Sequence, residues 1–274
     1  MGRTSGNAGK GSGMPRFAAN ISMLFTEYPF DERIERAAAS GFKAVEILYP
    51  YMEDTDAAAK ALAKHNVELV LFNVPAGNVA AGERGFANDP RRVDEFRAGV
   101  EKATALASEM GCQKLNCLAG LTLPDVSIHD QWETLKSNLR FAAGQAELRE
   151  VTQLVEPLNT IDNPGFLICS PHRGFSLIEE VGHPNLMLQY DLYHAQRTEG
   201  NLTSTIRDHI GQIGHIQIAD NPGRHEPGTG EINYPFMFKT LDEAGYAGWV
   251  SLEYSPSKQT EQSLSWIADW GYSL

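Results

Sequence analysis

The sequence contains few cysteines. Only Cys112, Cys117 and Cys169 occur in 274 residues. An odd number cannot pair fully within one chain, and their spacing matches no metal-binding pattern. We therefore expect reduced thiols that pack as small apolar side chains. This argues against a disulfide scaffold and against a cysteine-ligated metal site.

Long apolar runs and a basic surface are also lacking. No stretch approaches the roughly eighteen apolar residues that span a bilayer, and the N-terminus has no apolar core of a secretory signal. We expect a cytoplasmic protein with no membrane partner. Lys and Arg number 23 against 35 Asp and Glu, a net charge of -12, with no basic stripe that could follow a phosphate backbone. Nucleic acid is therefore not an expected partner.

The N-terminal stretch differs in composition from the rest of the chain. Its sequence, MGRTSGNAGKGSG, is rich in Gly and Ser and has no apolar pattern. We interpret residues 1–13 as a disordered segment or a remnant of cloning. A chain of 274 residues that is 42% hydrophobic suits one (β/α)8 barrel of about 250 residues. A single domain is expected over residues 14–274.

Strand-like and helical patterns alternate along this domain. Apolar runs predict strands at 17–25 (with its loop), 44–48, 67–74, 114–120, 152–159, 186–191, 214–220 and 249–254. Helical spacing predicts helices at 30–40, 55–65, 90–110, 128–149, 173–181, 202–211, 234–244 and 260–270. Strict alternation implies a parallel sheet, and eight units imply that the sheet closes. The predicted fold class is α/β, a (β/α)8 TIM barrel.

Four consecutive predicted strands in the second half end in a potential metal ligand. These residues are Glu156 in QLVEP, Asp191 in LQYD, Gln217 in HIQIAD and Glu253 in VSLEY. The carboxyl ends of barrel strands converge on one mouth, where active sites of this fold are built. Three carboxylates gathered there repel one another unless a cation neutralises them. Because the set offers amide and carboxylate oxygens, we expect Mg²⁺ or Mn²⁺ rather than Zn²⁺.

Strand alternation predicts a second set of polar residues below these ligands. Gln189, His215 and Ser251 lie two positions before a ligand and therefore point into the barrel as well. We expect them to orient the ligands, although His215 has the alternative of a core histidine with satisfied hydrogen bonds. Two Gly-rich stretches, residues 75–85 and 227–233, lack the spacing of nucleotide-binding loops and are interpreted as mobile lids.

Further residues near the predicted strand ends are candidates for substrate contact: His194, Arg224, Arg84 and Glu46. His194 follows Asp191 by about one helical turn and could hydrogen-bond a substrate oxygen. The two arginines are the best available cations for a substrate carboxylate, because a guanidinium binds it through two hydrogen bonds. Glu46 is either a substrate contact or a buried ion-pair partner.

The segments LVEPLNTIDNPGF, QYDLYHAQRTEG and GHIQIADNPGRHEPGTGEINY resemble hydroxypyruvate isomerases. These belong to the xylose-isomerase-like TIM barrel superfamily, which also holds ketose 3-epimerases and endonuclease IV. With NISMLF, NVPAGNVAAGERG and WVSLEY, the resemblance covers nearly all of residues 15–270. It implies that Glu156, Asp191, Gln217 and Glu253 hold a divalent metal, and that both glutamates form the acid/base pair. Gln217 departs from the epimerases, which commonly carry histidine there.

The resemblance and the chemistry of these residues lead to one expected activity. We expect a metal-dependent aldose/ketose isomerase of small hydroxy-oxo acids, converting hydroxypyruvate to tartronate semialdehyde (2-hydroxy-3-oxopropanoate) through an enediolate. The pattern does not distinguish which glutamate is the base. A 2-oxo-tetronate isomerase and a ketose 3-epimerase are alternatives, and an abasic-site endonuclease or a non-catalytic sugar-acid binder are more remote ones. A homodimer or homotetramer is also expected.

Overall fold

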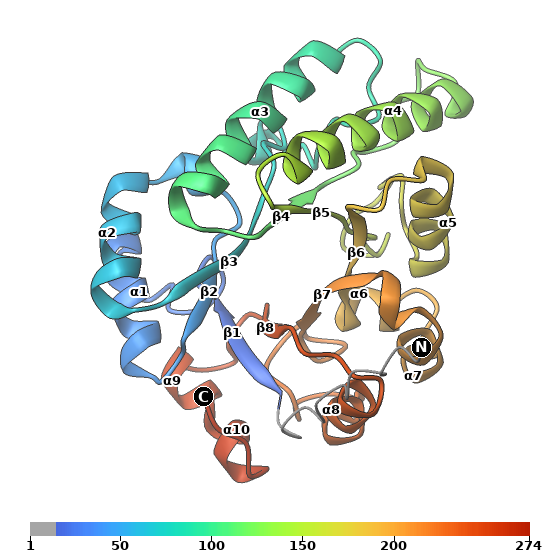
Figure 1. Ribbon diagram of the computed structural model, residues 1–274. Coiled ribbons are helices and arrows are strands. Elements are labelled where there is room, and N and C mark those ends of the chain that lie inside the picture. Colours follow the sequence, from blue (N-terminus) through green and yellow to red (C-terminus); the bar gives the residue numbers. More distant parts are fainter. Residues whose placement is uncertain (1–14) are drawn as a thin grey trace, which may run out of the picture.

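Eight parallel strands close into a barrel, as the sequence predicts (Figure 1). The structure is a computed structural model that describes residues 15–274, so the predicted N-terminal segment, residues 1–13, lies outside the described residues. Each strand pairs in parallel with its neighbours in the chain, and β8 pairs with β1. The strands are β1 (Arg16–Asn20), β2 (Ala44–Glu46), β3 (Glu68–Asn73), β4 (Lys114–Cys117), β5 (Thr152–Val155), β6 (Leu186–Asp191), β7 (Ile213–Ile218) and β8 (Trp249–Leu252).

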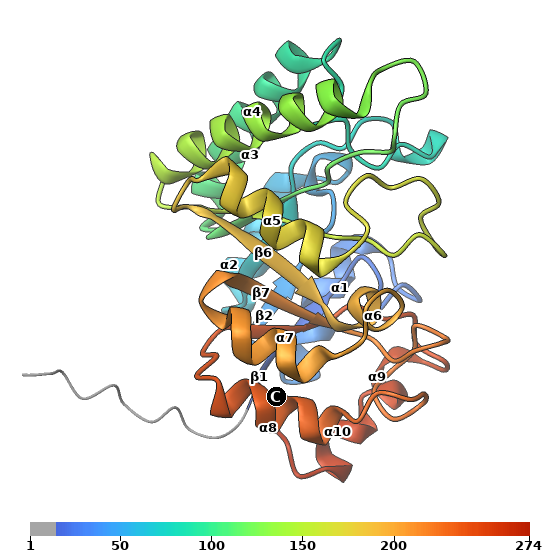
Figure 2. The same ribbon diagram turned by 90° about the vertical axis from the view of Figure 1, so that its right-hand side faces the viewer.

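Helices surround the strands on all sides of the barrel (Figures 1 and 2). They are α1 (Phe30–Ala39), α2 (Thr55–His65), α3 (Val93–Met110), α4 (Ile128–Glu147), α5 (Pro171–Val181), α6 (Leu192–Gln196), α7 (Leu202–His209), α8 (Tyr234–Glu243), α9 (Thr260–Ser263) and α10 (Ser265–Asp269). Short 3-10 helices are η1 (Pro50–Met52), η2 (Val79–Ala81) and η3 (Ile210–Gln212). Two differences from the sequence prediction stand out. The last predicted helix is two short helices, and α6 was not predicted as a helix.

Local sequence explains where the long helices begin and end. At the start of α2 the Asp54 carboxylate accepts a hydrogen bond from the Ala57 backbone N–H, and at the start of α4 the Ser127 hydroxyl accepts one from Asp130. Such caps satisfy donors that have no partner within the helix. Helix α3 ends at Gly111, whose φ of 67° lies in the left-handed region that favours glycine. These caps set the loops between helices and strands.

The apolar core has two layers. The larger layer lies between the strands and the helices. In it the Phe17 ring of β1 packs edge-on against Phe238 of α8 and Trp266 of α10, with ring centroids 5.5 and 5.4 Å apart. The smaller layer lies at the amino end of the strands and includes Ala18 and Leu154. Because apolar side chains fill that end, polar groups inside the barrel gather toward the other end.

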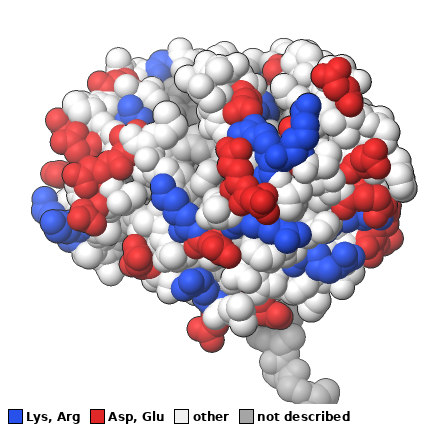
Figure 3. Space-filling model, turned by 90° about the horizontal axis from the view of Figure 1, so that it is seen from above, with Lys and Arg blue, Asp and Glu red and all other residues white. Residues whose placement is uncertain are grey.

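The surface carries charges of both signs. On the face above α3 and α4, Lys and Arg side chains are interspersed with Asp and Glu rather than forming a continuous basic area (Figure 3). Lys136 on α4, for example, lies 2.7 Å from Glu133 and 3.2 Å from Glu180 on α5. Among residues 15–274, no helix combines the length and the apolar character needed to cross a bilayer.

Candidate active site

The four predicted ligands all lie at the carboxyl end of the barrel. Glu156 directly follows β5, Asp191 is the last residue of β6, Gln217 lies in β7, and Glu253 directly follows β8. The register of the strands places Asp191 beside Gln217. All four residues are at most 5% exposed. The sequence therefore located the mouth of the barrel and the strand ends that line it.

A cavity of about 130 Å³ opens at this end of the barrel, and of the four predicted ligands Glu156 and Glu253 line it, whereas Asp191 and Gln217 do not. It is lined by Leu48, Tyr49, Asn73, Arg84, Leu118, Glu156, Leu158, Asn163, His194, Arg224 and Glu253. Both predicted acid/base glutamates are thus in its wall, as are both candidate arginines and the candidate histidine. Glu46 is not among the lining residues. The volume suits a molecule of a few carbon atoms rather than a large substrate.

The three carboxylates at the mouth of the barrel lie in an unfavourable electrostatic environment. Burial, together with the neighbouring Asp191 carboxylate, raises the pKa of Glu156 to about 8. Burial also raises the pKa of Asp191, and raises that of Glu253 well above its ordinary value. The guanidinium of Arg224 opposes these shifts, since its Nη2 lies 3.1 Å from Glu253 Oε2 and 3.6 Å from Asp191 Oδ2. One arginine does not balance three buried carboxyl groups, so a further cation would stabilise their ionised forms.

The geometry around Asp191 fits such a cation. Its Oδ1 accepts a hydrogen bond from the Tyr193 backbone N–H at 2.8 Å, which caps α6. Its buried Oδ2 accepts no hydrogen bond from the described part of the chain. Potential ligand atoms of Glu156, Asp191 and His194 lie within 4.8 Å of one another. A buried carboxylate oxygen without a donor, next to further oxygen atoms, is the arrangement that a hard divalent cation uses.

His194 faces the cavity as a hydrogen-bond donor. Its Nδ1 accepts a hydrogen bond from the Asn159 backbone N–H at 3.3 Å and lies 2.6 Å from the Asn159 side-chain amide. Burial, with a smaller effect of Arg224, lowers the pKa of His194 well below its ordinary value, so the ring is neutral. A neutral imidazole that accepts at Nδ1 must carry its proton on Nε2. The Nε2–H therefore points toward Asp191 and the cavity, where it suits a substrate oxygen better than a metal.

A polar network holds Gln217 from below. Its Oε1 accepts a hydrogen bond from Gln189 at 2.6 Å, and its Nε2 donates to Glu46 at 2.9 Å. Glu46 is fully buried and also pairs with His215. Gln189 thus contacts a predicted ligand directly, as strand alternation predicted, whereas His215 reaches Gln217 through Glu46. Burial lowers the pKa of His215, so its contact with Glu46 is a hydrogen bond of a neutral imidazole rather than an ion pair.

Comparison with known proteins assigns the fold to a family. Residues 34–270 match the family described as xylose isomerase-like TIM barrel. The chain belongs to the xylose isomerase-like TIM barrel family. It is 47% identical to hydroxypyruvate isomerase of Escherichia coli K12 over 93% of this chain and 98% of that protein, and 42% identical to 2-oxo-tetronate isomerase of Cupriavidus necator with the same coverage of each. These relatives confirm the resemblance that the sequence motifs indicated.

A solved structure from the family shares the whole architecture. A crystal structure described as an AP endonuclease of family 2 from Brucella melitensis is 45% identical, with a TM-score of 0.91, and the match covers 94% of this chain and 99% of that one. Its barrel is therefore superimposable on this one over nearly the full length. The descriptions of the relatives differ in activity, so the site chemistry has to decide between them.

The loop that carries Arg224 is organised by a buried carboxylate that the sequence did not single out. The Asp220 side chain accepts hydrogen bonds from the backbone N–H groups of Gly228, Gly230 and Ile232. The Arg224 carbonyl accepts a further one from the Ser255 backbone at 2.8 Å. In this family member the loop is thereby fixed around one aspartate, and the guanidinium is held over the carboxylates.

Asparagines are the site residues that sequence reasoning missed. Asn116 of β4 donates to Glu156 at 2.9 Å, and Asn20 at the end of β1 donates to Glu46 at 3.2 Å and to Glu253 at 3.4 Å. Asn159 likewise contacts His194, so Glu156, Glu253 and His194 each form a hydrogen bond with an asparagine. The available signal was the parity of the strands, since an uncharged polar residue on the inward face of a barrel strand needs a partner.

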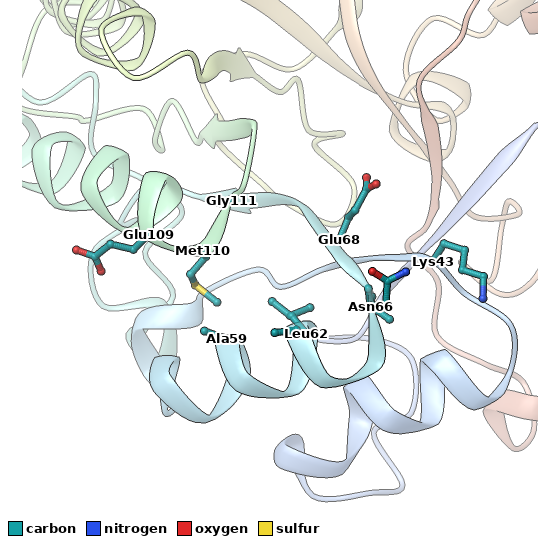
Figure 4. Close-up of a pocket in the computed structure, with 10 residues that line it drawn as sticks. Lys43, Ala59, Leu62, Asn66, Glu68, Glu109, Met110 and Gly111 are labelled. Carbon is teal, nitrogen blue, oxygen red and sulfur yellow. The ribbon is translucent and has the colours of Figure 1, made fainter.

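A larger cavity lies at the opposite end of the barrel. It has a volume of about 490 Å³ and is bounded by the ends of α2 and α3 and the start of β3, with Lys43, Leu62, Glu68 and Met110 in its wall (Figure 4). Glu68 is the first residue of β3, whereas Asn73, the last, lines the cavity at the mouth. Active sites of this fold form at the carboxyl end of the strands. The smaller cavity is therefore the candidate active site.

Proposed function

We propose that this protein is an isomerase of small hydroxy-oxo acids. The preferred candidate substrate is hydroxypyruvate, and the product is then tartronate semialdehyde. The observation that carries the proposal is the composition of the cavity at the mouth. Two glutamates, Glu156 and Glu253, share a volume of about 130 Å³ with Arg84, Arg224 and His194. This is a combination of acid/base groups with cations and a hydrogen-bond donor for a small anion. The E. coli relative named hydroxypyruvate isomerase supports it.

The reaction moves hydrogen between two neighbouring carbon atoms. One glutamate would remove a proton from carbon 3 of hydroxypyruvate, and a proton would be delivered to carbon 2. The hydroxyl proton on carbon 3 passes to the former ketone oxygen, so atoms and electrons balance and no external oxidant is required. Burial of Glu156 and Glu253 favours proton uptake by either carboxylate, and His194 Nε2–H can donate to a substrate oxygen.

We further propose that Glu156, Asp191, Gln217 and Glu253 hold Mg²⁺ or Mn²⁺. The Asp191 Oδ2 accepts no hydrogen bond from residues 15–274 and lies 3.6 Å from both Arg224 Nη2 and His194 Nε2, which supports this assignment, and the oxygen-rich donor set favours a hard cation. Bound there, the cation would polarise the ketone and hydroxyl oxygens of the substrate and so acidify the carbon-bound proton. Gln189 and Glu46 would orient the Gln217 amide, and Asn116 would orient Glu156.

Removal of divalent metal provides the test of the reaction class. Protein stripped with a chelator and incubated with hydroxypyruvate in D₂O is expected to show no deuterium incorporation and no conversion by proton NMR. Adding Mg²⁺ or Mn²⁺ should restore both, because the carbon-bound proton is otherwise weakly acidic. Full activity of the stripped protein would contradict the metal assignment. An inert metal-restored protein would contradict hydroxypyruvate as the substrate.

Two other activities have specific support. The C. necator relative named 2-oxo-tetronate isomerase makes a four-carbon 2-oxo acid the second candidate substrate, to be tested in the same NMR assay. The B. melitensis structure makes abasic-site cleavage worth a direct assay with an abasic oligonucleotide. We expect no cleavage, since the carboxylate/histidine cluster found among residues 15–274 contains a single histidine rather than a multi-metal set. A homodimer or homotetramer stays a prediction.

Replacement of His194 by Asn separates a substrate donor from a metal ligand. The Asn side chain can still accept the hydrogen bond of the Asn159 backbone but cannot reach the position of Nε2. We expect kcat/KM for hydroxypyruvate to fall about 10- to 100-fold, the loss typical of one hydrogen bond to a charged or reacting group. Metal affinity, measured by calorimetry, should stay within about threefold, whereas loss of a true ligand would lower it about 10-fold or more.

A further inference from the structure

The two arginines that line the cavity have different partners. The Arg224 guanidinium is paired with two carboxylates, Glu253 and Asp191. The Arg84 guanidinium instead donates from Nη1 to two backbone carbonyls, at 2.9 Å to Glu83 and at 3.4 Å to Val79. Within residues 15–274, no Asp or Glu oxygen lies within 4.0 Å of it. Arg224 therefore already forms ion pairs with carboxylates of the protein, whereas the guanidinium of Arg84 can pair with an anion in the cavity.

A separate ion pair fixes the segment on which Arg84 lies. Arg92 donates from Nη1 to Glu83 Oε1 at 2.5 Å, and its other nitrogens donate to both oxygens of Glu95 at 2.7 Å. Its guanidinium also lies 3.8 Å from the centre of the Phe86 ring. The second oxygen of Glu83 accepts from the Asn78 backbone. Glu83 is thus held at both oxygens, directly before Arg84 in the chain.

The other side of this loop packs closely against the barrel. Gly85 has a φ of 89°, and a Cβ there would lie 2.0 Å from the Leu118 carbonyl oxygen. Only glycine allows this approach to the loop after β4. The segment between η2 and α3 is consequently held by Glu83 on one side and by Leu118 on the other. The structure shows a braced loop here, where the sequence suggested a mobile lid.

We propose that Arg84 binds the substrate carboxylate and that the Glu83–Arg92 pair positions it, which makes the site selective for acids over neutral sugars of the same length. This inference rests on the proposed function, because it assigns the anion of that substrate. Arg84 Nε and Nη2 donate no hydrogen bond to the described residues. These two nitrogens can therefore donate one hydrogen bond each to a carboxylate. Glu83 and Arg92 are positioning residues, acting through the backbone that carries Arg84.

The placement of groups in the cavity agrees with this division of roles. Arg84 comes from the loop after β3, whereas Glu156 and Glu253 directly follow β5 and β8. Tyr49 lies close enough to both Glu156 and Arg84 to be affected by their charges. Burial and the charge of Glu156 raise the pKa of Tyr49 to about 12, and the charge of Arg84 opposes the shift. A carboxylate held at Arg84 would leave the ketone and hydroxyl carbons of a three-carbon acid directed toward the glutamates. Arg224 would then balance the glutamate charges.

The role of Arg84 as the carboxylate-binding residue, here called the anchor, is tested by comparing the binding of an acid with that of a neutral molecule of equal length. Glycerate and dihydroxyacetone are titrated calorimetrically into metal-restored protein, and neither assay requires turnover. Arg84→Gln is expected to weaken glycerate binding about 30-fold, within the range for hydrogen bonds to a charged group, and to change dihydroxyacetone binding less than about threefold. Equal losses for both molecules, unchanged glycerate affinity, or no glycerate binding by the unmodified protein would each overturn the anchor.

Kinetics on hydroxypyruvate test the positioning pair. Arg92→Gln should raise KM several-fold with kcat within about twofold, because the groups that transfer protons are unchanged. Arg92→Lys should recover part of the loss, since the ammonium can still pair with Glu83. Arg91→Gln is the matched control: this neighbouring arginine pairs with Asp89 at 2.8 Å and should leave KM unchanged. A purely structural role for Arg92 would lower thermal stability without this split between KM and kcat, and would overturn the positioning role.

The outcomes keep the anchor and the proposed function apart. If the unmodified protein binds glycerate through Arg84 but converts no hydroxy-oxo acid, the anchor stands and the isomerase proposal fails. If it isomerises hydroxypyruvate and Arg84→Gln leaves KM unchanged, the isomerase stands and the carboxylate must bind elsewhere, with Arg224 the other lining arginine. Each result therefore overturns one proposal and leaves the other standing.

Discussion

Glu253→Gln is expected to lower kcat for hydroxypyruvate by about 10³-fold, within the range for loss of a positioned acid/base group. The side chain is 5% exposed, lines the cavity and accepts hydrogen bonds from Asn20 and Arg224, so glutamine keeps its size and one of its two acceptor oxygens while removing the basic carboxylate. Glu156→Gln should have a similar effect, since this residue occupies the same kind of position on β5. Initial rates in saturating substrate and metal measure both.

Deuterium exchange distinguishes the two glutamates. The variant that lacks the base should show neither exchange at carbon 3 nor conversion, because the first proton is not removed. The other variant should still exchange at carbon 3 while forming little product. Glu231→Gln is the control, since this exposed carboxylate only braces the loop through Asn221 and Gln196 and should leave kcat within about twofold, as surface changes usually do. Near-normal turnover by both active-site variants would remove them from the mechanism.

The barrel could be predicted because its pattern is local. Each strand is a short apolar run and each helix has its own periodicity, so eight units are visible without any long-range contact. Boundaries were less accurate where apolar residues continue past the last strand pairing. The predicted strand at 152–159 ends at Val155, because Glu156 turns into the site and Pro157, which has no backbone N–H, packs near Gly174 of α5, although Leu158 is still buried. Helix α6 was missed because it has five residues and its N-cap is Asp191, which was interpreted only as a ligand.

The sequence predicted which residues lie at the strand ends of the site, but not which side chains contact them. Glu156, Asp191, Gln217 and Glu253 follow one rule, the position at the carboxyl end of a strand. The partners of these residues follow no such rule. Asn116 and Glu156 meet because β4 and β5 are adjacent, and Asn159 of the loop after β5 meets His194 of α6. Likewise, sequence alone could not show which arginine is neutralised by carboxylates.

The buried network beneath Gln217 makes a second large effect expected, this time on stability. Glu46→Ala would leave His215 and the Gln217 and Asn20 amides without their shared acceptor. Each buried donor left without an acceptor costs about 1–3 kcal/mol of unfolding free energy, and three donors lose theirs here, so a loss of about 3 kcal/mol or more is expected. The thermal midpoint should fall by roughly 10 °C, given about 2–4 °C per kcal/mol for a chain of this size.

Comparison of substitutions at this position separates hydrogen bonding from packing. Glu46→Gln keeps the volume and one acceptor oxygen, so its loss of stability should be about half that of Glu46→Ala or less. Glu231→Ala, at an exposed position, should change stability by less than about 0.5 kcal/mol. Since Glu46 accepts from Gln217, both substitutions should also weaken metal binding in calorimetry, by about 10-fold or more for alanine. A Glu46→Ala protein that unfolds at the original temperature would show that the network does not stabilise the barrel, and unaltered metal affinity would show that Gln217 does not depend on it.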